Sequence, residues 1–447
     1  MKVVIIGNGI AGTTCARFVR KLDSSAEILI ISAESEHFFS RTALMYMYMG
    51  HMGYEQLKPY EDHFWPQNRI DLLYDRVERI DFDSKALHTT GTGKIGYDKL
   101  VLAVGSKYNK FGWPGQDLTG VHGMVSLQDL QEMERLTEQG IRRAVVVGGG
   151  LIGIEVAEMY HSRNFPVTLM VREDSYWSKV LPAPESQMVN RQITEAHIDL
   201  RLSTELDRIE DDGRGRVAAV VTKSGERIPC DTVALTAGVR PNIDFLKDSP
   251  LQIDRGILVD DYLRTSIPDV YALGDCMQVR EPQPGRQAIE AVWYVGRISG
   301  ETAAYNLCGR TVPYRPGIWF NSAKFIQLEY QIYGEAPAKL PDHLHTLYWE
   351  HPKGDKAIRI NYDAATKAVR GFHLMGQRYR QEVCEKWIAE ETHIEEVLPR
   401  LGMANFDPEL YKQYDHELVA QYNQENGTSL QLRQRRGLPA VLRFLAR

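Results

Sequence analysis

The amino-acid sequence predicts an α/β fold with two parallel-sheet domains, followed by a smaller α+β domain. Two observations predict the parallel sheets: an apolar run followed by a glycine turn and a helix-like stretch opens the chain at Lys2–Lys21, and the same pattern returns at 144–157. From about Tyr314 the chain becomes aromatic and alternates apolar with polar residues, as in AIRINYD, which is typical of an antiparallel sheet. A length of 447 residues accommodates several domains of about 100–200 residues.

The first glycine turn has every element of a dinucleotide-binding unit. The apolar run Val3–Ile6 is followed by three glycines, namely Gly7, Gly9 and Gly12. A second apolar run, Ile28–Ile31, precedes Glu34, which lies 22 residues after Gly12. Such glycines let an anionic pyrophosphate approach a helix N-terminus, and an acid about 20 residues on binds the ribose. The pattern therefore predicts a Rossmann-like, dinucleotide-binding domain.

The second glycine turn starts 141 residues after the first. It follows the run Ala144–Val147 and contains Gly148, Gly150 and Gly153. After the next apolar run, Val167–Val171, the chain has Arg172 and Glu173. Arg172 could pair with a 2′-phosphate and favour NADPH, whereas Glu173 could bind a 2′-hydroxyl and favour NADH. We expect a second Rossmann-like domain whose choice of nicotinamide nucleotide stays open.

Composition excludes several other classes of protein. Charged residues make up 25% of the chain and the net charge is −6, so nucleic acid is not an expected partner. No apolar run approaches the roughly 18 residues of a membrane span, and Val3–Ile6 is too short for the apolar part of a signal peptide. The five cysteines contain no C-x-x-C pair, which fits a reducing, cytoplasmic location and predicts no bound metal.

Five segments, read together, carry a resemblance to a known family. They are GNGIAG at 7–12, YDKLVLAVGS at 97–106, GGGLIGIE at 148–155, GVRPN at 238–242 and YALGDC at 271–276. In this order they resemble the FAD-dependent pyridine-nucleotide oxidoreductases, in the branch with NADH oxidases, rubredoxin and ferredoxin reductases and the flavin part of nitrite reductase. The resemblance covers about residues 1–320, and Val104 replaces a threonine that is usual in the family.

The resemblance implies two cofactor sites. Residues expected to bind FAD are Gly7, Gly9, Ile10, Ala11, Gly12, Glu34, Arg41, Ala103, Gly105, Gly274 and Asp275. Residues expected to bind NADH or NADPH are Gly148, Gly150, Leu151, Ile152, Gly153, Glu155, Arg172 and Gly238. In such enzymes a hydride passes from the nicotinamide to the flavin, so no catalytic acid or base is assigned.

The segment HFFSRTALMYMYMG at 37–50 contains no cysteine. Relatives that reduce disulfides carry a redox-active cysteine pair there, and the oxidases and peroxidases of this branch carry one. Phe39, Ser40 and Arg41 instead match the Tyr-Ser-Arg segment of rubredoxin and ferredoxin reductases. We therefore expect no redox-active cysteine, since such chemistry needs an attacking thiolate. Arg41 could place positive charge near the flavin or its phosphates, or be a salt-bridged surface residue.

The family layout also predicts the domain limits. The FAD-binding domain should be discontinuous, at 1–115 and 243–318, with the NAD(P)-binding domain inserted at 116–242. A C-terminal interface domain at 319–400, which often dimerises in relatives, makes a homodimer possible. Residues 401–447 should form a helical tail.

The end of this tail is basic and amphipathic. After Glu425 there is no acid, but there are five arginines, namely Arg433, Arg435, Arg436, Arg443 and Arg447. The apolar residues Leu438, Val441, Leu442 and Leu445 have helical spacing. This helix could pack on its own domain, dock an acidic redox partner or contact an anionic membrane surface.

The favoured hypothesis is an NAD(P)H-dependent FAD reductase that passes electrons to a small ferredoxin or rubredoxin-like protein. The missing cysteine and the Ser-Arg segment support it. One alternative is an NAD(P)H oxidase or quinone reductase, and another is a flavin subunit of a larger electron-transfer complex.

Overall fold

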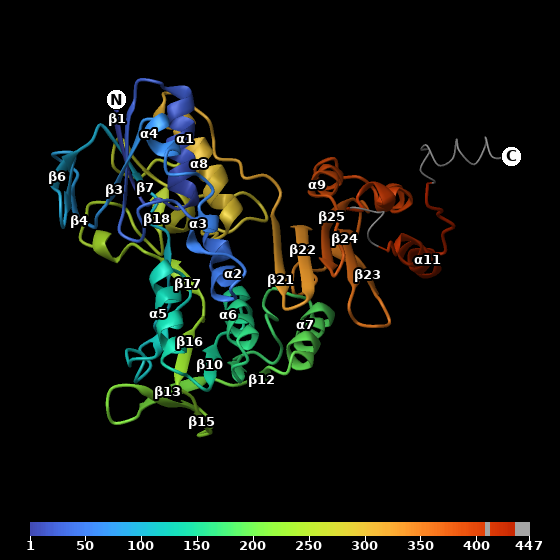
Figure 1. Cartoon of the computed structure of the whole chain (residues 1–447). Helices are drawn as coiled ribbons and strands as arrows, with labels where there is room; N and C mark the ends of the chain where they lie inside the picture. Colours follow the sequence, from blue (N-terminus) through green and yellow to red (C-terminus); the bar gives the residue numbers. More distant parts are fainter. Residues whose placement is uncertain (407–411, 434–447) are drawn as a thin grey trace, which may run out of the picture. The chain divides into compact units, whose positions relative to one another are not determined.

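The computed structural model of the chain describes residues 1–406 and 412–433 (Figure 1). Their contacts divide the chain into two compact units. The first consists of Met1–Arg172 and Ile198–Pro316, and the second of Glu173–His197 and Gly317–Arg447. The first unit contains two five-stranded parallel sheets and the second a five-stranded antiparallel sheet. The predicted α/β class, with two Rossmann-like domains and a smaller C-terminal domain, is confirmed.

The first parallel sheet has the strand order β19-β7-β1-β2-β3. Its strands are β1 (Lys2–Ile6), β2 (Glu27–Ser32), β3 (Ile70–Tyr74), β7 (Lys99–Leu102) and β19 (Val270–Ala272). Because helices cover parallel sheets on both faces, such strands are continuous apolar runs rather than alternating ones. Since β1 pairs with β2 on one side and β7 on the other, the strand order reverses there. Ligands bind at the carboxyl ends of strands beside such a reversal.

Two helices, α1 (Ile10–Leu22) and α8 (Trp293–Leu307), lie side by side on this sheet (Figure 1). A Cβ atom at Gly300 of α8 would lie 2.5 Å from the backbone oxygen of Ala11, so only glycine allows this contact. The smaller elements of this part are α3 (Tyr54–Leu57), α4 (Phe64–Gln67) and an antiparallel sheet of β4 (Val77–Asp81), β5 (Ala86–Thr89) and β6 (Gly93–Gly96).

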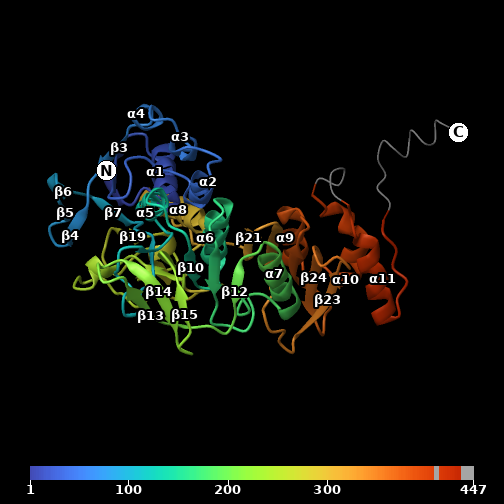
Figure 2. The same ribbon diagram turned by 60° about the horizontal axis from the view of Figure 1, so that its bottom comes forward.

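The second parallel sheet has the order β12-β11-β10-β16-β9. Its strands are β9 (Val121–His122), β10 (Ala144–Val147), β11 (Val167–Met170), β12 (Asp199–Arg201) and β16 (Thr232–Leu235). Two helices accompany it, α5 (Leu127–Glu138) and α6 (Leu151–Ser162). Figure 2 also shows the antiparallel sheet of β13 (Leu206–Asp211), β14 (Val217–Thr222) and β15 (Arg227–Pro229).

Within the first unit several segments connect the two sheets and their helices. The chain crosses between them at β8 (Ser106–Tyr108) and β17 (Val239–Pro241), which pair antiparallel. Helix α2 (Leu44–Tyr48) packs against α5 and α6. There the hydroxyl of Tyr48 lies 2.7 Å from Thr137 Oγ1, and the guanidinium of Arg163 lies 3.8 Å from the Tyr48 ring centre. Shorter pieces are η1 (Arg41–Ala43), η2 (Asp244–Leu246), η3 (Gly274–Cys276), β18 (Ile257–Val259) and β20 (Met277–Val279).

The second unit is built on a sheet with the order β21-β22-β25-β24-β23. Its strands are β21 (Phe320–Phe325), β22 (Leu328–Gly334), β23 (Leu344–Glu350), β24 (Ala357–Asp363) and β25 (Val369–Met375). Its helices are α7 (Ala183–Glu195), α9 (Gln381–Ala389), α10 (Ile394–Val397), η4 (Leu398–Met403) and α11 (Asp415–Asn426). Residues of α9, α10, η4 and α11 share an apolar core with the sheet.

A buried ion pair ties α7 to the C-terminal sheet within this second unit. Arg359 Nε and Nη2 donate to the two carboxylate oxygens of Glu185 at 2.6 and 2.9 Å. His373 Nδ1 lies 3.2 Å from Glu185 Oε1. Burial alone would raise the pKa of Glu185, but the hydrogen bonds and charges of His373 and Arg359 outweigh it and lower the pKa. Removing one partner of such a pair would leave a buried charge without compensation.

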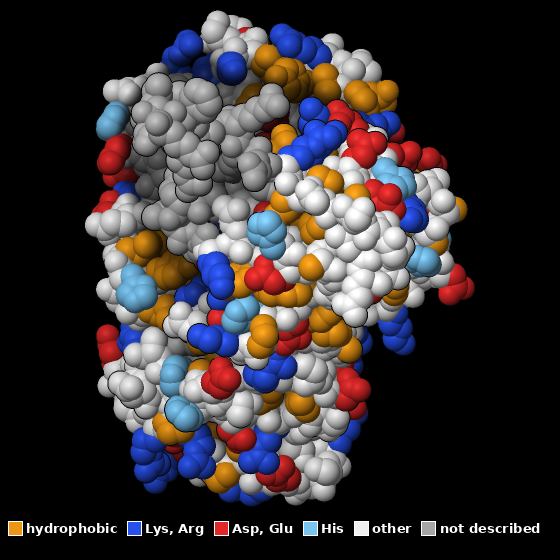
Figure 3. Space-filling view, turned by 90° about the vertical axis from the view of Figure 1, so that its right-hand side faces the viewer, with side chains coloured by type: hydrophobic (Ala, Val, Ile, Leu, Met, Phe, Trp, Pro, Cys, Tyr) orange, Lys and Arg blue, Asp and Glu red, His pale blue; other side chains and the backbone are white. Residues whose placement is uncertain are grey.

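The charges on the surface and the predicted C-terminal helix are relevant to the expected protein or membrane partners. On the face shown in Figure 3, basic and acidic side chains are interspersed. Among the described residues no helix is long and apolar enough to cross a membrane, and no cluster of three metal-ligating side chains occurs in that part of the chain. The basic amphipathic helix predicted around Leu438–Leu445, with Arg435, Arg436, Arg443 and Arg447, lies outside the described residues.

Candidate functional site

The first glycine turn joins β1 to α1 and is shaped by close backbone contacts. A Cβ atom at Gly7, whose φ is +109°, would lie 2.1 Å from the backbone oxygen of Ala103 after β7. At Gly12 it would lie 2.0 Å from the backbone oxygen of Gly7. A Cβ atom at Gly9 would have no atom within 4 Å. Two glycines are thus required by packing, and the third faces open space.

That open space lies at the N-terminus of α1. Gly9 caps the helix without a side-chain hydrogen bond, and the first turn is formed by Ile10, Ala11 and Gly12. The first amides of a helix have no partner within it and carry partial positive charge. The turn therefore offers donors and room to an anionic pyrophosphate.

Asn8, which the sequence analysis did not single out, fixes the shape of this turn. Its side-chain amide donates to the backbone oxygen of Ser35 at 2.8 Å, and its Oδ1 accepts from the hydroxyl of Ser32 at 3.0 Å. These bonds tie the turn to the residues after β2. The only signal in the sequence was an amide residue between two glycines.

Glu34 follows β2 and contacts both Arg41 and the start of α5. Arg41 donates to its two carboxylate oxygens at 2.7 and 2.6 Å, and the backbone amide of Leu127 donates to Oε1 at 2.9 Å. Burial lowers the pKa of Arg41, but the hydrogen bond and charge of Glu34 outweigh it, so the net shift is upward. The predicted site residues Glu34 and Arg41 are therefore brought together.

Asp275 lies at the same sheet edge, on η3 after β19. Ser106 Oγ donates to its Oδ2 at 2.8 Å, and burial raises the pKa of the Asp275 carboxyl although Ser106 and Arg41 oppose the shift. The preceding Gly274 has a φ of +64°, and a Cβ atom there would lie 3.1 Å from that of Ala11. A carboxylate has about four acceptor positions, so Asp275 can accept more donors, such as the hydroxyls of a polyol. These residues fit FAD.

Gly105 and Gly238 lie where the chain crosses between the two sheets. Both have a positive φ, of +67° and +85°. The backbone oxygen of Gly105 accepts from the amide of Asn242 at 2.9 Å, and that of Gly238 accepts from the amide of Asn109 at 3.1 Å. The two glycines thus shape the segments that join one glycine turn to the other.

The second glycine turn, between β10 and α6, repeats the construction of the first. A Cβ atom at Gly148, with φ +136°, would lie 2.5 Å from the backbone oxygen of Thr236, and one at Gly153 would lie 2.2 Å from that of Gly148. At Gly150 it would meet nothing within 4 Å. Helix α6 begins at Leu151, and Ile152 is its second residue. This turn also offers the room and the helix end that a dinucleotide requires.

Two charged residues accompany the second turn. Glu155 lies on α6, and its surroundings desolvate the carboxyl, which, with the charge of Glu158, raises its pKa to about 7. Arg172 follows β11. The next residue, Glu173, begins the segment that belongs to the second unit, where its carboxylate lies 2.8 Å from Lys179 Nζ.

The five cysteines form no disulfide, and most of their thiols are buried. All five are free, and all but Cys308 are buried. Burial raises the pKa of the thiols of Cys15, Cys230, Cys276 and Cys384. The attacking form of cysteine is the thiolate, so this environment disfavours thiol chemistry at those four positions.

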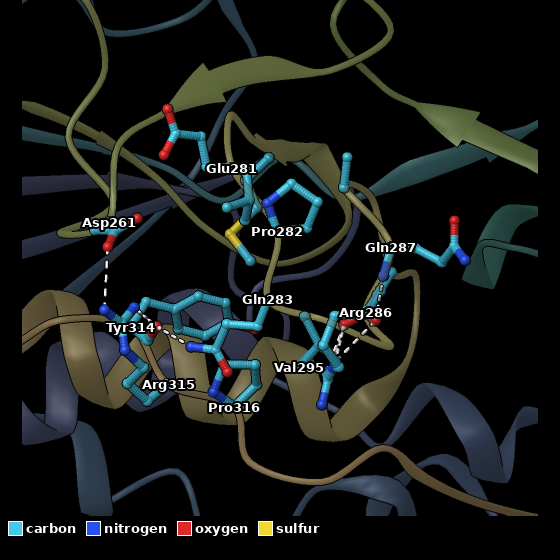
Figure 4. A pocket seen from close by; sticks show the side chains of 14 residues that line it. Asp261, Glu281, Pro282, Gln283, Arg286, Gln287, Val295, Tyr314, Arg315 and Pro316 are labelled. Atoms are coloured by element: carbon cyan, nitrogen blue, oxygen red, sulfur yellow. Dashed lines mark hydrogen bonds and ion pairs between the residues drawn. The ribbon is translucent and has the colours of Figure 1, made fainter. Parts of the chain in front are cut away.

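A pocket lies between β20, the segment before α8 and the residues that end the first unit (Figure 4). It contains about 400 Å³ of empty space, part of it open to solvent. Arg286 and Glu290 form an ion pair in its wall, with Nε–Oε1 at 2.9 Å and side chains 6% and 7% exposed. The buried hydroxyl of Tyr314 has no hydrogen-bond partner. None of its lining residues was predicted as a site residue.

Similarity to known proteins agrees with this geometry. The family described as pyridine nucleotide-disulphide oxidoreductase matches residues 1–293. The rhodocoxin reductase of Rhodococcus erythropolis is 32% identical over 331 residues, which cover 73% of this chain and 76% of that protein. The biphenyl dioxygenase system ferredoxin–NAD(+) reductase component of Paraburkholderia xenovorans (strain LB400) is 28% identical over 312 residues, or 70% of this chain and 76% of the relative.

Among solved structures, the NAD-dependent persulfide reductase of A. fulgidus has the same fold. The TM-score is 0.83 at 24% identity, and the match covers 96% of this chain and 84% of that one.

Proposed function

The chain belongs to the pyridine nucleotide-disulphide oxidoreductase family, and we propose that it passes electrons from NADH or NADPH, through FAD, to a small iron–sulfur or rubredoxin-like protein. The observation that carries this proposal is the pair of glycine turns, at Gly7–Gly12 and Gly148–Gly153, each packed against a parallel sheet within one compact unit. Relatives named as reductases of rhodocoxin and ferredoxin support the class of acceptor.

Each group of residues has a proposed role. The first-turn amides of α1, at Ile10, Ala11 and Gly12, bind the FAD pyrophosphate, Glu34 binds its ribose, and Asp275 accepts from its ribityl hydroxyls. FAD, when bound, supplies a ring that accepts a hydride from the nicotinamide and passes the electrons onward.

At the second turn, the first-turn amides of α6 at Leu151 and Ile152 bind the NAD(P)H pyrophosphate. Arg172 and Gly238 follow strands of the same sheet and lie beside this nucleotide in the proposal. The protein orients the two nucleotides and needs no acid or base of its own for hydride transfer. Both NADH and NADPH are candidate donors.

Location and assembly follow from the same features. We infer a reducing, cytoplasmic environment, because all five cysteines are free. We also propose that the C-terminal domain can form a homodimer, which size-exclusion chromatography with light scattering would test.

Anaerobic stopped-flow spectroscopy tests the proposed function. Purified protein is mixed with NADH or NADPH, and the flavin absorbance is followed, first without oxygen and then with air or a ferredoxin. We expect rapid bleaching of the flavin absorbance, slow return in air and fast return with the iron–sulfur protein. Fast return in air or with a quinone would instead support an oxidase or quinone reductase. No bleaching by either nucleotide would contradict hydride transfer and leave a flavin subunit that receives electrons from elsewhere.

A further inference from the structure

The carboxylate of Glu34 is bound from two directions. On one side is the fork of Arg41, with Nη1–Oε1 at 2.7 Å and Nη2–Oε2 at 2.6 Å. On the other side is the N-terminus of α5, whose Leu127 amide donates to Oε1 at 2.9 Å. The side chain of Gln128 also donates to the backbone oxygen of Glu34 at 2.8 Å. Glu34 therefore connects the first glycine-turn fold with the first helix of the inserted one.

Arg41 contacts the start of α5 as well. Its Nη1 donates to the backbone oxygen of Val125. The turn that it contacts is held by a capping box, since Ser126 Oγ accepts from the Asp129 amide at 3.1 Å and Asp129 Oδ2 accepts from the Ser126 amide at 2.9 Å. The guanidinium of Arg41 thus binds both Glu34 and the N-terminal turn of α5, which the capping box holds in place.

Charge favours this arrangement. A carboxylate at a helix N-terminus is stabilised by the partial positive charge there. The positive charge of Arg41 is also near Asp129 and Asp275, both of which raise its pKa along with Glu34. Arg41 therefore offsets negative charge from three acids at once.

The number of hydrogen bonds sets how much of Glu34 remains for a ligand. A carboxylate has about four acceptor positions, and the three donors from Arg41 and Leu127 leave capacity mainly on Oε2. A ribose hydroxyl can therefore bind Glu34 while Arg41 and α5 stay in place. The ligand and the helix would then share one carboxylate rather than compete for it.

From these contacts we propose that Arg41 is a positioning residue that couples FAD binding to the docking of α5. The inference rests on the proposed binding of the FAD ribose by Glu34. Because coupling between two binding events is reciprocal, FAD strengthens the contact of α5 with Glu34, and a docked α5 strengthens FAD binding. The planar fork matters, since lysine cannot contact both carboxylate oxygens and Val125 in this way.

Titration of FAD-free protein with FAD, followed by flavin fluorescence, gives the first test. Arg41→Met should raise the dissociation constant at least tenfold, and Arg41→Lys should restore only part of the loss. Arg135→Met is the control. Arg135 pairs with Glu132 within α5, and its side chain has the same exposed fraction as that of Arg41, 42%. The control should bind FAD within twofold of the wild type.

Hydrogen exchange at the amides of residues 127–130 gives a second readout that does not depend on activity. FAD should slow this exchange in the wild type and in Arg135→Met, but not in Arg41→Met at saturating FAD. Equal FAD affinity in Arg41→Met and Arg135→Met would overturn the coupling, and so would equal protection of α5. Failure of the wild type itself to bind FAD would overturn the proposed function first.

Discussion

At the scale of single residues, Glu155 is a carboxyl group held in a desolvating environment. It lies on α6 just after the second glycine turn, and its pKa is raised from 4.5 to about 7 by desolvation and by Glu158. Its folded form therefore retains a proton that the unfolded chain releases at lower pH. Such a group makes stability fall as the pH rises between the two pKa values.

Replacing Glu155 with glutamine should remove this pH dependence. Relative to wild type, the stability of FAD-free Glu155→Gln should increase as the pH rises from about 4.5 to 7 and then level off. The increase should be at most roughly 3.5 kcal/mol, at 1.4 kcal/mol per pKa unit. Urea unfolding of both proteins at a series of pH values measures this difference in the free energy of unfolding. Glu138→Gln, at an exposed position of α5, is the control. Parallel pH profiles for wild type and Glu155→Gln would contradict the prediction.

At the scale of elements, the three glycines of the first turn have different physical roles. Gly12 and Gly7 leave no room for a side-chain atom, whereas Gly9 faces open space and has an ordinary φ of −68°. Glycine at position 12 lets α1 lie close to β1, and glycine at position 7 lets the turn lie close to Ala103 after β7. The other position is needed only if a ligand comes close.

Alanine substitutions separate these roles. Gly12→Ala places a Cβ atom 2.0 Å from the Gly7 oxygen, so it should cost about 2 kcal/mol or more and also weaken FAD binding. Gly9→Ala should leave the stability of the FAD-free protein within about 0.5 kcal/mol while reducing FAD affinity at least tenfold. Thermal unfolding and FAD titration of both variants decide this. Normal FAD binding by Gly9→Ala would show that no phosphate approaches the turn.

Local patterns predicted the elements that depend on neighbours in the sequence. Both glycine turns and their strands could be recognised because a strand, a turn and a helix N-terminus follow one another directly. Contacts between distant residues could not be recognised, such as the bond between Glu34 and the Leu127 amide, 93 residues apart, or the pairing of Asp275 with Ser106. The same holds for the ion pair of Glu185 with Arg359, which joins α7 to a sheet much later in the chain.

At the scale of the whole molecule, most of the thiols are shielded from solvent, including Cys276, which lies next to Asp275. Four of the five cysteines are buried, and Cys308, at the end of α8, is partly exposed. Electron transfer through this protein should therefore depend on the flavin and not on a thiol–disulfide exchange.

Alkylation tests this directly. Iodoacetamide should label native protein at Cys308 alone, as judged by intact mass and peptide mapping, and should leave the rate of flavin reduction by NAD(P)H unchanged. Cys308→Ser should prevent labelling. Loss of flavin reduction after labelling would show that a thiol takes part in the reaction.

The first parallel sheet takes its edge strand β19 and its covering helix α8 from residues that follow the entire second sheet. On the ribosome, β1, β2, β3 and β7 emerge first, and their sheet must wait for the stretch from Leu102 to Leu307. At about 5–20 residues per second, this stretch takes roughly 10–40 s to synthesise. During that time the inserted domain can fold, while one face of α1 has no partner. The nascent chain thus completes its flavin-binding fold only after the second parallel sheet has been made, although β1, β2, β3 and β7 precede that sheet.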